Sequence, residues 1–160
     1  MAVNPPARPR FRTLAVLLAG AAVIVAFAPT VLAESANVTR GDLNAFATAA
    51  GQTITGHVQM VRTADGKTLV SLHVEGLLAN TAYGSHVHKA ACGTSDADGH
   101  YKFDPAGAAA PPNEIWLSFT TNAAGIGNSD ATAYATAGPN AVSVVVHAPG
   151  GAKIACADLG

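Results

Sequence analysis

Four histidines stand where the chain could bring their imidazole rings to one metal ion. His86-Val87-His88 places two of them two residues apart, and alternate side chains of a strand project to the same face of a sheet. His147 ends a valine-rich run and precedes Ala-Pro-Gly-Gly, so it would lie where a strand ends. His100 follows Asp98-Gly99, where a turn could return it over the pair. The spacing predicts that these four histidines are metal ligands.

The donor set indicates which ion to expect. Four imidazole nitrogens without a neighbouring thiolate or thioether suit a borderline transition metal. In the usual order of affinities, such a nitrogen site favours Cu²⁺ over Zn²⁺. We therefore expect one copper per chain.

Cys92 and Cys156 are the only cysteines. An even count in an exported chain predicts one disulfide, because an oxidising compartment lets thiols pair and persist. In the chain-entropy model, closing so long a loop would stabilise the fold by roughly 4 kcal/mol. The alternatives are a metal site, which two thiols without nearby histidines support poorly, and a pair of free thiols.

The elements that must position these residues are strands. From residue 34 onward the chain is rich in Gly, Thr, Val and Ala, and its apolar residues alternate in short runs, which is a β pattern. Turn signals separate the runs, so an antiparallel sandwich or barrel, immunoglobulin-like in architecture, is expected. The stretch from Ala90 to Pro112 is predicted to be a long functional loop. The expected strands are Thr53 to Thr63, Lys67 to Glu75, Tyr83 to His88, Ile115 to Thr120, Ala131 to Ala135 and Val142 to His147, with Asp42 to Ala50 divided between strand and helix and favoured as strand.

The first two strands are expected to form a hairpin. Asp65-Gly66 between them is typical of a tight turn, because such turns need residues that tolerate positive φ. With that turn, His57 and His73 would point to opposite faces of the hairpin. Both are therefore interpreted as surface or structural residues that do not share a metal.

The beginning of the chain is predicted to be a targeting segment. Arg8, Arg10 and Arg12 precede an uncharged apolar run from Leu14 to Ala28, and Val31-Leu32-Ala33 ends in small residues. This is the pattern of a signal peptide over residues 1–33, with an uncleaved membrane anchor as the alternative. The run is short for a membrane span. Residues 34–160 would then form one exported domain, secreted, periplasmic or held at the cell envelope, without stable membrane insertion.

Charge excludes one class of partner. Removing the three leader arginines from nine basic residues leaves six against ten acidic ones, a formal charge of −4. Nucleic-acid binding normally shows as a basic stripe or patch. No nucleic-acid partner is therefore expected, and the sequence leaves the oligomeric state open.

Several motifs, in order and from about Thr53 to the end, resemble the copper–zinc superoxide dismutase family. Gly84-Ser85-His86-Val87-His88 is similar to its Gly-Phe-His-Val-His, and Val144-Val145-Val146-His147 to its late Val-Val-His. Gly99-His100 with Phe103-Asp104-Pro105 is similar to its Gly-Pro-His-Phe-Asn-Pro region, and Ala155-Cys156 to its Leu-Ala-Cys. The resemblance implies a Greek-key β-barrel, copper on the four histidines and superoxide as substrate.

The chain departs from that family in two places. Asn113 and Trp116 stand where the family has a zinc histidine and an aspartate, so a copper-only variant without zinc is expected. Only eight residues separate His147 from Cys156, where the family inserts a charged loop. Lys153 stands in place of the family's arginine and keeps the positive charge without its two-pronged donor geometry.

The resemblance implies an exported copper-dependent superoxide dismutase, with catalytic roles for Lys153, as anion guide, and for His100. Without zinc, the outer ring nitrogen of His100 needs another acceptor, and Glu114 is the first candidate and Asp104 the second. One alternative is a non-catalytic copper-binding or buffering protein outside the cytoplasm. Another is a structural β-domain in which the histidines are incidental.

Overall fold

The structure is a computed structural model that describes Met1, residues 36–49 and residues 51–160. Except for Met1, the predicted signal peptide lies outside the described residues. Among the described residues, no helix is long and apolar enough to cross a membrane.

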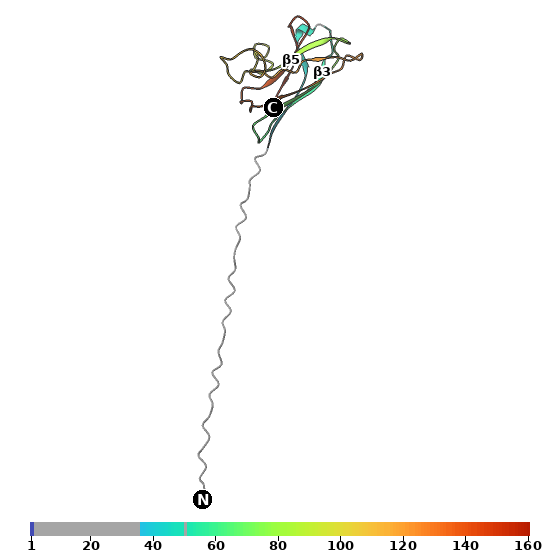
Figure 1. Cartoon of the computed structure of the whole chain (residues 1–160). Coiled ribbons are helices and arrows are strands. Elements are labelled where there is room, and N and C mark those ends of the chain that lie inside the picture. Colours follow the sequence, from blue (N-terminus) through green and yellow to red (C-terminus); the bar gives the residue numbers. More distant parts are fainter. Residues whose placement is uncertain (2–35, 50) are drawn as a thin grey trace. The chain divides into compact units, whose positions relative to one another are not determined.

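The described domain is all-β, as predicted, and consists of two antiparallel sheets that pack together (Figure 1). The first sheet has the order β1 (Asn37–Asp42), β3 (Thr55–Arg62), β4 (Thr68–Glu75), β7 (Gly127–Ala133). The second has the order β2 (Asn44–Ala45), β9 (Lys153–Asp158), β8 (Ser143–His147), β5 (Ala82–His88), β6 (Phe119–Thr120). One 3₁₀ turn, η1 (Ala47–Ala49), follows β2.

Alternation places the core between the sheets. In β4, every second residue from Thr68 to Val74 is buried while Leu69, Ser71 and Glu75 are exposed, as expected of a strand with one face in the core. In β8 all five residues are buried. The outer face of β8 is therefore also covered, and Ala97 of the long loop packs there against Val145 and Cys156.

The predicted strands are recovered with shifted ends. Of the run from Ile115 to Thr120, only β6 is a regular strand, although Trp116 forms an isolated bridge with His86. The ambiguous stretch from Asp42 contains β2 and η1 rather than one strand. The prediction did not include β1 or β9. In the case of β9, the segment is rich in alanine and lacks the large apolar residues that mark a strand.

The prediction that His57 and His73 face opposite ways is wrong. They are direct partners across β3 and β4, and their ring centroids lie 5.2 Å apart. The connection runs from Thr63 to Lys67, longer than a two-residue turn, and Gly66 has a φ of 83°. Compared with a two-residue turn, a type I turn followed by a left-handed glycine shifts the pairing of the two strands by one residue. This shift makes His73, rather than Val74, the partner of His57, so both imidazoles lie on the same face.

Candidate metal centre

The outer face of the second sheet supplies three of the four predicted ligands. His86 and His88 lie on β5, and their partners on β8 are Val145 and Ser143. His147 lies on the same face, two residues beyond Val145, and is paired with Gly84. The alternation of side chains therefore puts all three imidazoles over one patch of the sheet.

The long loop brings the fourth ligand to the same patch. His100 forms an isolated antiparallel bridge with His88. On either side, the Lys89 amide donates to the Gly99 carbonyl at 3.1 Å and the Tyr101 amide to the Val87 carbonyl at 2.8 Å. Tyr101 is only 4% exposed, so the loop is held against β5 by backbone hydrogen bonds and by a buried aromatic ring.

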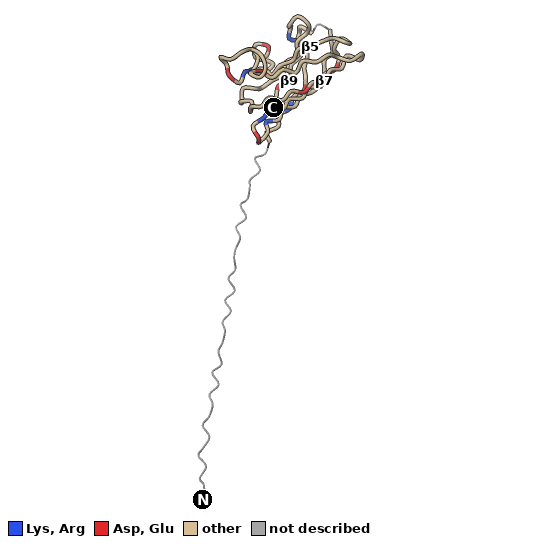
Figure 2. The backbone as a smooth tube through the Cα atoms, viewed as in Figure 1, with Lys and Arg blue, Asp and Glu red and all other residues tan. Residues whose placement is uncertain are grey.

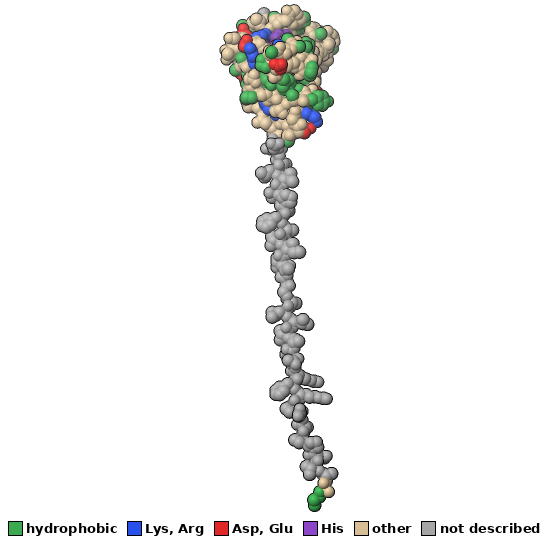
Figure 3. All heavy atoms as spheres, turned by 60° about the vertical axis from the view of Figure 1, so that its left-hand side comes forward, with side chains coloured by type: hydrophobic (Ala, Val, Ile, Leu, Met, Phe, Trp, Pro, Cys, Tyr) green, Lys and Arg blue, Asp and Glu red, His purple; other side chains and the backbone are tan. Residues whose placement is uncertain are grey.

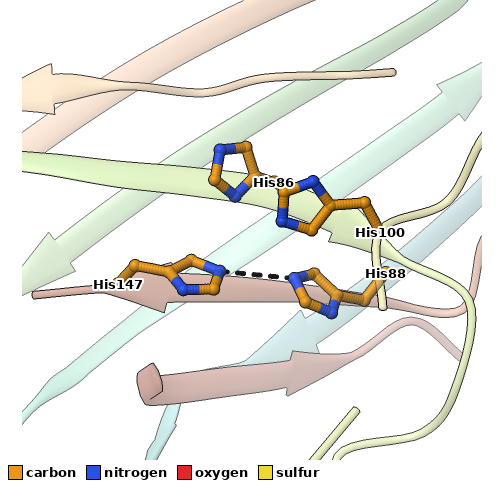
Figure 4. Close-up of side chains that lie close together, drawn as sticks. All are labelled: His86, His88, His100 and His147. Atoms are coloured by element: carbon orange, nitrogen blue, oxygen red, sulfur yellow. Dashed lines mark hydrogen bonds between the residues drawn. The ribbon is translucent and has the colours of Figure 1, made fainter. Parts of the chain in front are cut away.

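The four-histidine cluster, His86, His88, His100 and His147, converges on one point. Each ring contributes one nitrogen to a set of four, and these four atoms all lie within 4.8 Å of one another. Figure 4 shows the rings turned toward one another, with the Nε2 atoms of His88 and His147 3.3 Å apart. Around an ion bound at about 2 Å, neighbouring nitrogens lie about 3 to 4 Å apart. The cluster can therefore hold one metal ion.

In three of the four rings, a hydrogen bond to the protein fixes which nitrogen faces the ion. The Nδ1 atoms of His88, His100 and His147 contact the Ala97 carbonyl (3.2 Å), a Glu114 carboxylate oxygen (2.7 Å) and the Gly151 carbonyl (3.1 Å) respectively. Since these partners only accept, each Nδ1 carries a proton and each Nε2 has a free lone pair. In His86 it is Nδ1 that is buried without a hydrogen-bond partner. The cluster thus offers the Nε2 atoms of His88, His100 and His147 as ligand atoms, and the unpaired Nδ1 of His86 is available as the fourth.

Burial keeps three of these rings neutral. It lowers the pKa of His86 to about 4 and that of His88 to about 3, and it also lowers the pKa of His147. The neighbouring His100 acts in the same direction on all three, because charges on adjacent imidazoles would repel. Neutral imidazole is the form that binds a metal.

Glu114, not Asp104, is the carboxylate beside His100. Its side chain is 1% exposed, and the oxygen that accepts from His100 also accepts from Trp116 Nε1 at 2.7 Å. Burial acts to raise the pKa of Glu114, but the hydrogen bonds from Trp116 and His100 outweigh it and hold the pKa below its usual value. Asp104 instead caps a turn of the loop, where its carboxylate accepts from the Ala106 amide at 2.9 Å.

Lys153 is bound to the loop rather than free in solution. Its ammonium group donates to the carbonyls of Asp96 and Asp98, both at 2.6 Å. These residues belong to the left-handed turn, residues 95–98, in which four successive residues have φ between 48° and 64°. Lys153 pairs with His147 across β8 and β9, so its charge lies beside the cluster.

The predicted disulfide is present. Cys92 and Cys156 are bonded, with Cα atoms 5.8 Å apart and a sequence separation of 64. The Cys92 amide also donates to the Asp158 carboxylate at 2.7 Å. The pair therefore attaches the long loop to β9, and its oxidation indicates an oxidising compartment.

The four-histidine cluster lies near the surface. The His100 side chain is 30% exposed and His147 is 8% exposed. Figure 3 shows histidine atoms at the surface beside basic side chains. Figure 2 shows acidic and basic residues interspersed along the described backbone, without a continuous basic stripe in that view. A small anion could thus approach the cluster.

Three contacts of the centre were not predicted from the sequence. The resemblance marks Trp116 only as standing where the family has an aspartate, although its place two residues after Glu114 is a signal for the contact between them. The carbonyls of Ala97 and Gly151 belong to the backbone, so no side chain in the sequence signals their contacts.

No family model and no curated protein matches this chain.

Proposed function

We propose that the four-histidine cluster binds one copper ion and that the protein is an exported copper-dependent superoxide dismutase. The observation that carries this proposal is the convergence of four imidazole nitrogens. In three of the four rings, the other nitrogen is hydrogen-bonded to an acceptor of the protein. A set of four neutral nitrogens favours Cu²⁺ over Zn²⁺. The disulfide supports export to an oxidising compartment.

The surrounding residues support access by a small anion. Copper held by His86, His88, His100 and His147 would supply one-electron redox chemistry, by which two superoxide ions and two protons give one oxygen and one hydrogen peroxide. The partly exposed ring of His100 borders the approach. The ammonium of Lys153 adds a positive charge beside His147, and such a charge attracts an anion and raises its local concentration.

Metal analysis together with a superoxide assay tests this proposal. The purified protein should hold about one copper per chain and turn over superoxide faster than free copper at equal concentration. His147→Ala should lose most of the copper, because three rings cannot complete the set. Full copper occupancy in that variant would overturn the assignment of the site.

A non-catalytic copper carrier is the second candidate, and one observation favours it. The Lys153 ammonium is already engaged by two carbonyls, and only eight residues separate His147 from Cys156, leaving little room for further guiding charges. A carrier would bind copper with the same stoichiometry and depend on the same histidines. Its superoxide turnover would not exceed that of free copper, which separates the two functions.

A further inference from the structure

The outer face of the first sheet carries a second pair of facing imidazoles. His57 on β3 and His73 on β4 are direct cross-strand partners. Both point away from the core, because their neighbours Val58, Leu72 and Val74 are buried between the sheets. This surface pair, His57 and His73, lies on the other sheet from the four-histidine cluster and takes no part in it.

The spacing of the surface pair suits one shared ion. Its ring centroids lie 5.2 Å apart with an interplanar angle of 35°. Within the four-histidine cluster, the corresponding centroid distances run from 4.1 to 6.5 Å. An ion about 2 Å from one nitrogen of each ring gives centroid distances of about 5 Å at a tetrahedral angle. The ring centres are therefore at a suitable distance, although the ligand atoms of His57, His73 and Glu75 do not all lie within 4.8 Å of one another as those of the four-histidine cluster do. Binding an ion requires the exposed side chain of His57 to turn toward His73.

His73 is held as metal-binding histidines are held. Its Nδ1 lies 2.8 Å from Asn128 Oδ1 on β7, which accepts a hydrogen bond from Nδ1–H and leaves Nε2 as the outer nitrogen. Glu75, two residues further along β4 and on the same face, places a carboxylate oxygen 3.0 Å from that Nε2. When an ion replaces the proton on Nε2, the same carboxylate is in reach to become a third ligand.

The surrounding charges favour a cation. Asp42 on β1 is the direct partner of His57, so carboxylates flank the surface pair on both sides, Asp42 on one and Glu75 on the other. The nearest basic residue on that face of β1, Arg40, donates to Gln59 Oε1 at 2.9 Å. Two histidines and a carboxylate, with water completing the shell, are an established ligand set for zinc.

We propose that His57, His73 and Glu75 form a second transition-metal site, on the outer face of the first sheet. It takes a divalent ion of borderline character, such as Zn²⁺ or Cu²⁺. The site is exposed and has three protein ligands, so it exchanges its ion more readily than the four-histidine cluster does. The protein then binds two ions on opposite sheets, whatever reaction the cluster supports.

Zinc titration of the full chain tests the site, because Zn²⁺ is redox-silent and permits NMR of the imidazole nitrogens. Calorimetry should show a weaker binding event in addition to that of the cluster. During that event, the ring nitrogens of His57 and His73 should shift. His57→Gln and His73→Gln should each weaken it by at least tenfold, and Glu75→Gln by about tenfold.

Ser71→Ala is the matched control, since Ser71 lies on the same face of β4, two residues before His73. It should leave the weaker event unchanged, and circular dichroism should show that all variants fold. Persistence of the event in a His57→Gln/His73→Gln double variant would overturn the site, and so would unshifted His57 and His73 resonances at saturating zinc. If the four-histidine cluster does not bind zinc, the test of the second site can still be interpreted, since the NMR signals report each histidine separately.

Discussion

Three of the four clustered histidines have one ring nitrogen engaged by the protein and the other free for an ion. The acceptors differ: a carbonyl of the long loop for His88, a buried carboxylate for His100 and a hairpin carbonyl for His147. Only the carboxylate carries a charge, and a charged acceptor raises the basicity of the ring it contacts. Glu114 is therefore the residue through which metal affinity can be altered without removing a ligand.

Glu114→Gln should lower copper affinity by about tenfold, since an amide oxygen still accepts from His100 and Trp116 but without the negative charge. Competition with a chelator of known affinity would measure the change. Asp104→Asn is the matched control, because the Asp104 carboxylate accepts from the Ala106 amide of its own turn and has no hydrogen bond with His100 or Trp116. Equal effects of the two substitutions would show that the local charge, rather than the contact with His100, is what matters.

At the scale of elements, the centre lies between a sheet face and the loop that covers it. The left-handed turn at residues 95–98 is unfavourable for residues with a side chain. Two of its carbonyls accept hydrogen bonds from Lys153, and the carbonyl of Ala97 meets His88. Lys153 thus helps hold a strained segment whose shape orients a ligand.

Lys153→Met should destabilise the protein by about 1 kcal/mol, since hydrogen bonds from a charged group are among the stronger ones and this group is partly exposed. Urea unfolding would give the free energy, and amide exchange should quicken at residues 95–99. Lys89→Met serves as control, because Lys89 reaches the same turn only through an exposed ion pair with the Asp98 carboxylate at 3.1 Å. Such a pair contributes little. An equal loss of stability from Lys89→Met and Lys153→Met would therefore contradict the role of Lys153 in holding residues 95–98.

How far elements could be predicted depends on which signals the residues carry. Alternation marked β3, β4 and β5, because their apolar residues are large and their neighbours polar. The register of β3 against β4 was missed, since Asp65-Gly66 fits a two-residue turn as well as the longer connection observed. Backbone contacts such as Ala97 to His88 follow from the loop's path, which residue types do not encode.

At the scale of the whole molecule, the two sheets and one covalent link place the centre. The all-β class, the disulfide and the grouping of four histidines followed from the sequence, because each depends on residue types that recur in a recognisable pattern. The disulfide ties position 92 to position 156, a separation of 64 residues. It therefore limits how far the loop bearing His100 can move from the sheet bearing the other three rings.

Folding also leaves the centre with an electrostatic cost that shows as a dependence of stability on pH. An unfolded histidine takes up its proton near pH 6.5, but burial lowers the pKa of His86 to about 4 and that of His88 to about 3. Between pH 6.5 and 4.5 the unfolded chain binds more protons than the folded one. The free energy of unfolding of the metal-free protein should therefore fall as the pH falls.

Urea unfolding at pH 7, 6 and 5 measures this loss, which is at most about 1.4 kcal/mol per pH unit for each histidine. His86→Gln should reduce the slope. His73→Gln should not reduce it, because hydrogen bonds to Asn128 and Glu75 raise the pKa of His73, so that its contribution is complete below pH 6.5 and is lost only as the pH rises. A metal-free protein equally stable at pH 7 and pH 5 would mean that the buried rings open to water before the chain unfolds.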